Sequence, residues 1–127
     1  MQIHINNESS EDYLETIYIL EKKNGVVKSA DIAREFNYSR ASISRAMGIL
    51  EKNGLIIFNQ KSHIILTEEG IKKAKSIYDR HITLKKFLIT VTGVDDNTAE
   101  MDACRIEHFI SPETFQGIKK YLKNLDK

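Results

Sequence analysis

Residues 29–50 read SADIAREFNYSRASISRAMGIL, and this stretch decides the fold. Apolar side chains recur in it at the spacing of an α-helix, first over residues 30–36 and again after Ser39. Ser29 and Ser39 each stand where the N-cap of a helix is expected, and the Asn-Tyr pair before Ser39 makes a tight break. Two short helices across a brief turn predict a helix-turn-helix motif.

The flanking sequence completes a winged helix-turn-helix domain over residues 1–66. On the N-terminal side, an apolar stripe predicts a helix that Ser9 or Ser10 caps. On the C-terminal side, two β-rich runs at residues 55–58 and 64–66 flank a polar turn. This pattern predicts a β-hairpin, the wing of the domain.

Three further helices are predicted over residues 67–127. The first begins at the N-cap Thr67 and runs to about residue 92, and the second spans roughly residues 98–110. The third begins at Ser111, with a proline in its first turn. These helices expose more apolar surface than they can cover among themselves, so a homodimer is expected. The predicted fold is therefore mostly α with a small β-hairpin wing, a winged helix-turn-helix followed by a three-helix module.

The composition is that of an ordinary globular protein. The chain has 127 residues, 41% of them hydrophobic, which suffices for a core. No apolar run approaches the roughly 18 residues that span a bilayer, and the N-terminus lacks a basic region followed by an apolar run. We therefore expect a soluble, cytoplasmic protein with no membrane partner. The single cysteine, Cys104, excludes an intrachain disulfide, which leaves a buried residue, a reactive thiol or a metal ligand.

The second helix of the helix-turn-helix motif has the composition of a helix that reads DNA. Short hydroxylated side chains let its backbone approach base edges, and an arginine can bind guanine through two hydrogen bonds or contact a phosphate. The whole chain carries a net charge of +1, but residues 26–62 hold six basic and three acidic side chains. The predicted contacts to double-stranded operator DNA are Lys28, Ser39, Arg40, Ser42, Ser44, Arg45 and Lys61. The alternative, a solvated helix face in a module for protein contacts, is disfavoured by the local positive charge.

Potential metal ligands occur on three of the predicted helices. Asp12 and Glu15 lie on one face of the first helix, away from its apolar stripe. On the helix predicted at residues 98–110, a thiol, an imidazole and carboxylates share one face. The residues on this face are Glu100, Cys104, Glu107 and His108. His81 lies within the apolar stripe of the helix that Thr67 caps. A core histidine, a small buried cysteine and solvated carboxylates would explain the same residues, and both interpretations stay open at this point.

The motifs together resemble the iron- and manganese-dependent repressors, the diphtheria-toxin-repressor family. The similarity runs in order along nearly the whole chain, without large gaps. Its most specific part is DACRIEH at residues 102–108, followed by Ser111. The other matching stretches are EDYLE at residues 11–15 with Ile17-Tyr18, Asp31-Ile32-Ala33, Leu66-Thr67 with Glu69-Gly70, and Arg80-His81. The chain is most similar to the short, manganese-regulator form, since the SH3-like domain of the longer iron regulators has no counterpart in this sequence.

The resemblance implies a homodimer in which metal joins the first helix to a metal-binding and dimerisation module at residues 67–127. By position, the ligands that the manganese type implies are Asp12, Glu15, His81, Glu107 and His108. Cys104 departs from that type, because it stands where manganese sensors carry a bridging carboxylate and iron sensors carry cysteine. Lys85 stands where the iron type has an acidic ligand, so Glu100 is the candidate to replace part of that type's ancillary site.

The resulting hypothesis is a metal-dependent transcriptional repressor of metal homeostasis. Ferrous iron or manganese is the expected corepressor, with zinc, cobalt or nickel as substitutes in vitro. The metal would cancel the repulsion between carboxylates and favour the DNA-binding conformation. An enzyme is not expected, because no oxyanion site or substrate cleft can be inferred around Cys104. The alternatives are a winged-helix regulator that responds to an organic ligand or to oxidation of Cys104, and an architectural or protein-interaction module without an effector.

Overall fold

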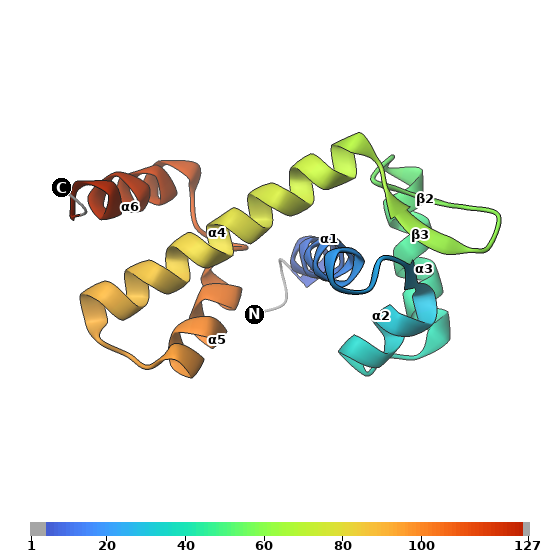
Figure 1. The fold of residues 1–127 in the computed structure, drawn as a ribbon, viewed down its shortest axis with the longest axis horizontal. Helices are drawn as coiled ribbons and strands as arrows, with labels where there is room; N and C mark the ends of the chain where they lie inside the picture. The colour runs from blue at the N-terminus through green and yellow to red at the C-terminus, as the bar shows by residue number, and fades with distance from the viewer. Residues whose placement is uncertain (1–4, 126–127) are drawn as a thin grey trace. The chain divides into compact units, whose positions relative to one another are not determined.

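The computed structural model describes residues 5–125, with side chains described from residue 10 onward. The chain forms two compact units, Met1–Lys75 and Ser76–Lys127, and the boundary between them falls inside one long helix (Figure 1). The first unit contains α1 (Ile5–Asn24), β1 (Val27–Lys28), α2 (Ser29–Phe36), α3 (Arg40–Lys52), β2 (Ile56–Phe58), β3 (His63–Leu66) and the start of α4 (Glu68–Thr92). The second contains the rest of α4, α5 (Asp96–Ile106) and α6 (Pro112–Leu125).

The predicted helix-turn-helix is formed by α2 and α3. Asn37 has a left-handed backbone, with φ of 56°, which ends α2. Ser39 then caps α3, because its Oγ accepts a hydrogen bond from the backbone N–H of Ser42 at 3.1 Å. The buried apolar core that holds the motif against α1 consists of Leu14, Ile17, Ile32, Ala33, Ile43, Met47 and Leu50. The opposite side of α3 therefore faces solvent.

The wing is a three-stranded antiparallel sheet with the strand order β1-β3-β2. The predicted hairpin is confirmed, with Ile56 opposite Leu66 across β2 and β3. The sequence did not predict β1, which pairs Val27 with Ile64 of β3. A strand of two residues has no alternation to detect, and its pairing partner lies far along the chain.

Asn59 organises the turn between β2 and β3. Its side-chain Oδ1 accepts hydrogen bonds from the backbone N–H groups of Lys61 and His63, both at 2.9 Å. Its backbone carbonyl accepts from the N–H of Ser62, also at 2.9 Å. The side chains of Gln60 and Lys61 are exposed at the tip and take no part in these bonds.

The start of α4 is fixed to the wing by Thr67 and Gly70. Thr67 Oγ1 accepts from the backbone N–H of Gly70 at 3.0 Å and donates to the carbonyl of Gly54 at 2.6 Å. Gly70 lies so near the chain before β2 that a Cβ atom there would be 2.0 Å from the carbonyl oxygen of Leu55. A side chain at position 70 would therefore displace the backbone.

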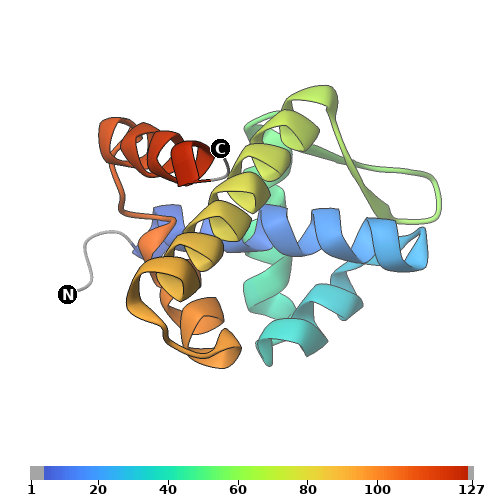
Figure 2. The same cartoon turned by 60° about the vertical axis from the view of Figure 1, so that its left-hand side comes forward.

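In the second unit, α5 turns back beside the C-terminal half of α4, and α6 follows (Figure 2). Leu84, Ala103 and Phe115, one from each helix, form the buried centre of this unit. Ser111 caps α6 by accepting from the backbone N–H of Thr114 at 3.1 Å. The described part of the chain contains no helix that is both long and apolar enough to cross a membrane.

Four predicted helix starts or ends differ from the structure. α1 begins at Ile5 and not after Ser9 or Ser10, because its first turn carries no apolar stripe that would reveal it. α2 includes Ser29, and its N-cap is Lys28, whose backbone N–H donates to Asp31 at 2.8 Å. The start of α2 is set by this local capping, which periodicity does not detect.

The other two differences are the two ends of α5. It begins at Asp96, after the N-cap Asp95, where the sequence predicted a start near residue 98, and it ends at Ile106, where the sequence predicted residue 110. The backbone N–H groups of Phe109 and Ile110 both donate to the carbonyl of Ile106 at 3.0 Å, which closes a tight turn. Pro112 disfavours helical backbone at the residue before it, Ser111, which caps α6. Glu107 is the C-cap of α5: it keeps a right-handed helical backbone, and its N–H donates to the carbonyl of Ala103 at 3.0 Å. His108 lies in the turn that follows.

Candidate metal centre

His81 is a buried histidine whose two ring nitrogens both face carboxylates of the second unit. It lies on α4 with 6% of its surface exposed. Its Nδ1 is 2.6 Å from Oε1 of Glu107, and its Nε2 is 2.7 Å from Oε2 of Glu100. Both distances are within hydrogen-bonding range, and which nitrogen donates depends on the tautomer. Imidazole nitrogens are common ligands of first-row dications.

Glu107 is the most buried acidic residue of the described chain, with no exposed surface. Its backbone carbonyl accepts a hydrogen bond from the Arg80 guanidinium at 2.7 Å. Its side-chain Oε2 has no hydrogen-bond partner among the described residues, and Nε2 of His108 lies 3.8 Å from it. A buried carboxylate oxygen without a partner is costly. A cation beside Oε2 would remove that cost, so the donor set fits a divalent metal ion.

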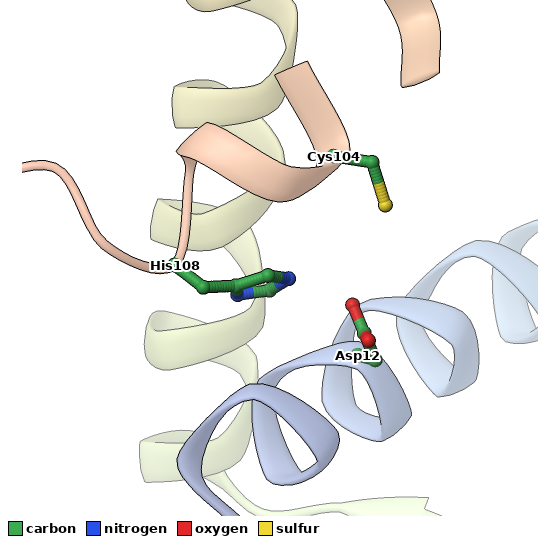
Figure 3. Close-up of side chains that lie close together, drawn as sticks. All are labelled: Asp12, Cys104 and His108. Carbon is green, nitrogen blue, oxygen red and sulfur yellow. The ribbon is translucent and has the colours of Figure 1, made fainter. Parts of the chain in front are cut away.

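Cys104 and His108 form a second pair of donors in the same unit. The Cys104 sulfur and a ring nitrogen of His108 lie within 4.8 Å of each other, close enough for one ion to contact both. Cys104 is exposed, whereas the His108 side chain is 1% exposed. Figure 3 draws both side chains, together with Asp12 of α1.

Glu100 belongs to an ion-pair network at the other edge of His81. Its Oε1 is 3.1 Å from the ammonium nitrogen of Lys85, which is also 3.2 Å from Oδ2 of Asp96. Hydrogen bonds to Glu100 and then to Asp96 raise the pKa of Lys85 above its usual range. Lys85 therefore carries its positive charge between these two carboxylates.

The first unit supplies two more carboxylates on α1. Glu15 is buried, with 8% of its surface exposed, and Asp12 is half-buried. They are three residues apart, so both lie on one side of the helix, as the sequence predicts. The neighbouring apolar residues Leu14 and Ile17 are fully buried in the core of the unit.

The residues predicted to contact DNA lie around α3 and the wing. Lys28, Arg40, Ser44, Arg45 and Lys61 are exposed, and Ser42 is half-buried. Ser39 is exposed, and its hydroxyl caps α3 and donates to Oγ of Ser42 at 3.0 Å. Exposed arginines beside short side chains leave the outer surface of α3 free to approach a nucleic acid.

Sequence reasoning found the donors of the second unit but missed the residues that hold them. Neither the Arg80-His81 motif nor the position of Asp96 indicates the contacts that these residues make. A usable signal was present, since Asp96 and Glu100 are four residues apart on α5 and Lys85 is four residues after His81 on α4. The pairing itself depends on how α4 packs against α5.

Comparison with known proteins covers both halves of the chain. Residues 7–64 match the family described as the iron dependent repressor N-terminal DNA binding domain. Residues 67–127 match the iron dependent repressor metal binding and dimerisation domain. Together the two matches include nearly every residue of the sequence.

Individual relatives agree with these matches. An uncharacterised HTH-type transcriptional regulator of Methanocaldococcus jannaschii is 35% identical over 118 residues, which are 92% of this chain and 94% of that protein. The HTH-type transcriptional regulator MntR of Shouchella clausii is 34% identical over 110 residues, 87% of this chain and 76% of that protein.

The fold has a counterpart among solved structures. The crystal structure of T. acidophilum IdeR superposes with a TM-score of 0.79 and 26% identity. The alignment covers 89% of this chain and 53% of that chain, so this chain spans about half the length of that relative. The resemblance to metal-dependent regulators noted from the sequence is confirmed, and these relatives are transcriptional regulators rather than enzymes. This chain belongs to the iron-dependent repressor family of metal-responsive transcriptional regulators.

Proposed function

We propose that this protein represses genes of metal homeostasis by binding palindromic operator DNA as a homodimer when a divalent metal ion, ferrous iron or manganese, is bound. The observation that carries the proposal is Glu107. Its buried Oε2 lacks a hydrogen-bond partner among the described residues, and its Oε1 contacts the buried His81. A carboxylate in this state is stabilised by a cation in direct contact.

The proposed ligands come from both units. The first unit supplies the carboxylates of Asp12 and Glu15 on α1. The second unit supplies Cys104 and His108, whose side chains Figure 3 draws, and His81 and Glu107. Carboxylate, imidazole and thiolate together form a mixed donor set of the kind that first-row transition metals accept.

The proposed regulation follows from where these donors lie in the chain. Asp12 and Glu15 belong to the unit that contains the helix-turn-helix, and the other ligands belong to the unit matched to metal binding and dimerisation. Without a cation the carboxylates of the two units repel one another if they approach. A bound dication turns this repulsion into attraction, and it favours the conformation in which the ligands of both units can reach it.

Operator binding is proposed for the exposed surface of α3 and the wing. The proposal is supported by the family match of residues 7–64 and by the exposed side chains of Arg40, Arg45 and Lys61. Residues 26–62 hold six basic and three acidic side chains, which favours a polyanion on this surface. A homodimer would present two such surfaces to the two half-sites of a palindrome.

The dimer is proposed for the second unit. Large apolar side chains remain exposed on all three of its helices and on the turn after α5. They are Ile82, Ile89, Val91, Met101, Phe109, Tyr121 and Leu125. So many exposed apolar residues in a module this small favour burial against a second copy of the chain.

The test is the affinity for operator DNA in chelator, and then after anaerobic addition of manganese, ferrous iron or zinc. We expect tight binding only with metal, and loss of the metal response in Glu107→Gln, which removes the buried charge but keeps the shape. Glu113→Gln, an exposed acid on α6, is the control and should respond like the parent. Equal DNA affinity with and without metal would contradict the proposal, and a response to thiol oxidation alone would favour Cys104 as a redox sensor.

A further inference from the structure

His81 has two ring nitrogens but can offer only one of them to a metal ion. A neutral imidazole carries one N–H and one lone pair, and the nitrogen that binds metal is decided by what the other one contacts. Here Nδ1 is 2.6 Å from Glu107 and Nε2 is 2.7 Å from Glu100. Both carboxylates could in principle attract the ion, and the sequence left Glu100 as a candidate ligand.

The two carboxylates differ in how much of their hydrogen-bonding capacity is used. Both oxygens of Glu100 have partners, since Oε2 contacts His81 and Oε1 contacts Lys85 at 3.1 Å. Glu107 uses only Oε1, and its buried Oε2 has no hydrogen-bond partner among the described residues. A metal ion would gain an available oxygen at Glu107, whereas at Glu100 it would have to displace an existing contact.

The charges around the two carboxylates differ in the same direction. The Lys85 ammonium lies within 3.2 Å of both Asp96 and Glu100, so the chain itself supplies a cation on the Glu100 side of His81. Glu100 is also half-exposed, with 49% of its side-chain surface accessible, so water screens its remaining charge. On the other side, Glu107 is fully buried and is not screened in this way.

We propose that Glu100 is a positioning residue and not a metal ligand. On this side of the centre, the ammonium group of Lys85 supplies the positive charge that neutralises Glu100. Glu100 accepts the Nε2 proton of His81, which leaves the lone pair on Nδ1 for the metal beside Glu107. Lys85 and Asp96 hold Glu100 in the orientation that this hydrogen bond needs. The inference rests on the proposed metal centre and assigns the roles of three residues around it.

A histidine ligand that donates its other N–H to a carboxylate is held in one tautomer and one ring orientation. The loss of such a partner lowers metal affinity by about 10-fold to 100-fold. The effect acts through His81, so it depends on hydrogen-bond acceptance and not on a negative charge at position 100. This difference separates a positioning role from a ligand role.

The experiment compares Glu100→Gln with Glu100→Ala in the full-length protein, with Mn²⁺ and Co²⁺ affinities measured by chelator competition. An amide oxygen still accepts the Nε2 proton, so we expect Glu100→Gln to stay within about threefold of the parent. We expect Glu100→Ala to lose about tenfold or more. The Co²⁺ d–d absorption, which reports the ligand set, should be the same in the parent and in Glu100→Gln. Glu113→Gln is the control for removing one acidic charge, and circular dichroism verifies that each variant is folded.

Two further measurements test the assignment of the nitrogens and of Lys85. ¹⁵N NMR of the Zn²⁺-loaded protein should show His81 protonated at Nε2 and metal-bound at Nδ1. In a Lys85→Met background, Glu100 is no longer neutralised and its charge attracts the metal, so Glu100→Gln should now cost about tenfold in affinity. The change from a small effect to a large one is the coupling that the proposal requires.

The proposal is overturned if Glu100→Gln loses as much affinity as Glu100→Ala and alters the Co²⁺ spectrum, because Glu100 is then a ligand. It is also overturned if the NMR spectra show metal on Nε2, or if Lys85→Met leaves the effect of Glu100→Gln unchanged. A parent protein that binds no metal would refute the proposed function itself, and that result would be evident before any variant is compared.

Discussion

Glu107 is held by two consecutive residues of α4. The Arg80 guanidinium binds its backbone carbonyl at 2.7 Å, and the His81 imidazole binds its carboxylate at 2.6 Å. Since Glu107 is the C-cap of α5 and begins the turn that follows, these bonds fix a side chain at the end of that helix. At the scale of single residues, the candidate centre is therefore defined by contacts between α4 and this turn.

Cys104 determines the metal preference that we expect. A thiolate is a soft ligand that favours ferrous iron, cobalt or zinc over manganese, while the carboxylates of Asp12, Glu15 and Glu107 keep the centre suitable for iron or manganese. We predict that ferrous iron activates DNA binding at least as well as manganese, measured anaerobically by operator affinity at matched free metal.

The same reasoning predicts that Cys104→Glu shifts activation toward manganese, because it replaces a soft donor with a hard one. The sulfur-to-cobalt charge-transfer absorption of the Co²⁺ protein reports directly on the Cys104 bond and should vanish in Cys104→Ser. If the parent lacks this absorption, Cys104 is not a ligand and cannot be used to infer metal preference.

At the scale of secondary-structure elements, the contact between α4 and the chain before β2 requires glycine. Gly70→Ala would place a Cβ atom 2.0 Å from the carbonyl oxygen of Leu55, a backbone atom that can move only with its segment. We predict a loss of roughly 1–3 kcal/mol in the free energy of unfolding, as for other overpacked sites, measured by urea denaturation.

The matched control for this prediction is Gly117→Ala in α6, where no heavy atom lies within 4 Å of the added Cβ. It should stabilise the protein by roughly 0.5–1 kcal/mol, since alanine favours helix more than glycine does. Similar effects of the two substitutions would mean that the approach of α4 to Leu55 is not tight.

The outer surface of α3 carries the prediction for DNA. Arg45→Ala should weaken operator binding by about 1 to 3 kcal/mol if the guanidinium binds a base through two hydrogen bonds. The exposed position of Arg45 means that the fold should be unaffected. Lys120→Ala, which removes an exposed charge from α6, should leave the affinity nearly unchanged at the same salt concentration. An Arg45→Ala variant that binds as tightly as the parent would show that α3 contacts DNA in a different register.

The elements that the sequence predicted well are those with a repeated pattern or a strong cap. Ser39 and Ser111 cap α3 and α6 as expected, and apolar periodicity located the long helix α4. Prediction failed at β1 and at the end of α5, where no repeated apolar pattern marks the element. β1 exists through its pairing with β3, and α5 ends where two N–H groups converge on one carbonyl.

For the candidate site too, the sequence predicted some features and not others. Residue types and spacing identified His81, Cys104, Glu107 and His108 as potential ligands, because these are the side chains that metals bind. Spacing could not assign a role to Glu100, since its two partners, Lys85 and His81, are both on another helix. Only the packing of α4 against α5 shows that both carboxylate oxygens of Glu100 already have partners.

At the scale of the whole molecule, dimerisation and metal binding are predicted to be separate events. Seven large exposed apolar residues lie on the helices of the second unit and on the turn after α5, and none of the proposed ligands is among them. We therefore expect the full-length protein to sediment as a dimer at micromolar concentration even in chelator. Addition of metal should change its DNA affinity far more than its sedimentation. A monomer without metal that dimerises when metal is added would instead make assembly the regulated step.

The turn of the wing has a consequence for how such a regulator can evolve. Asn59 closes the turn through the main-chain groups of Lys61, Ser62 and His63, so the side chains at positions 60 and 61 are not needed to fold it. Mutations at these two positions would have little effect on folding stability, so selection would act on them only through their effect on DNA binding. A gene duplicate could therefore drift toward a new operator at the wing tip, one residue at a time, while its metal response is inherited intact.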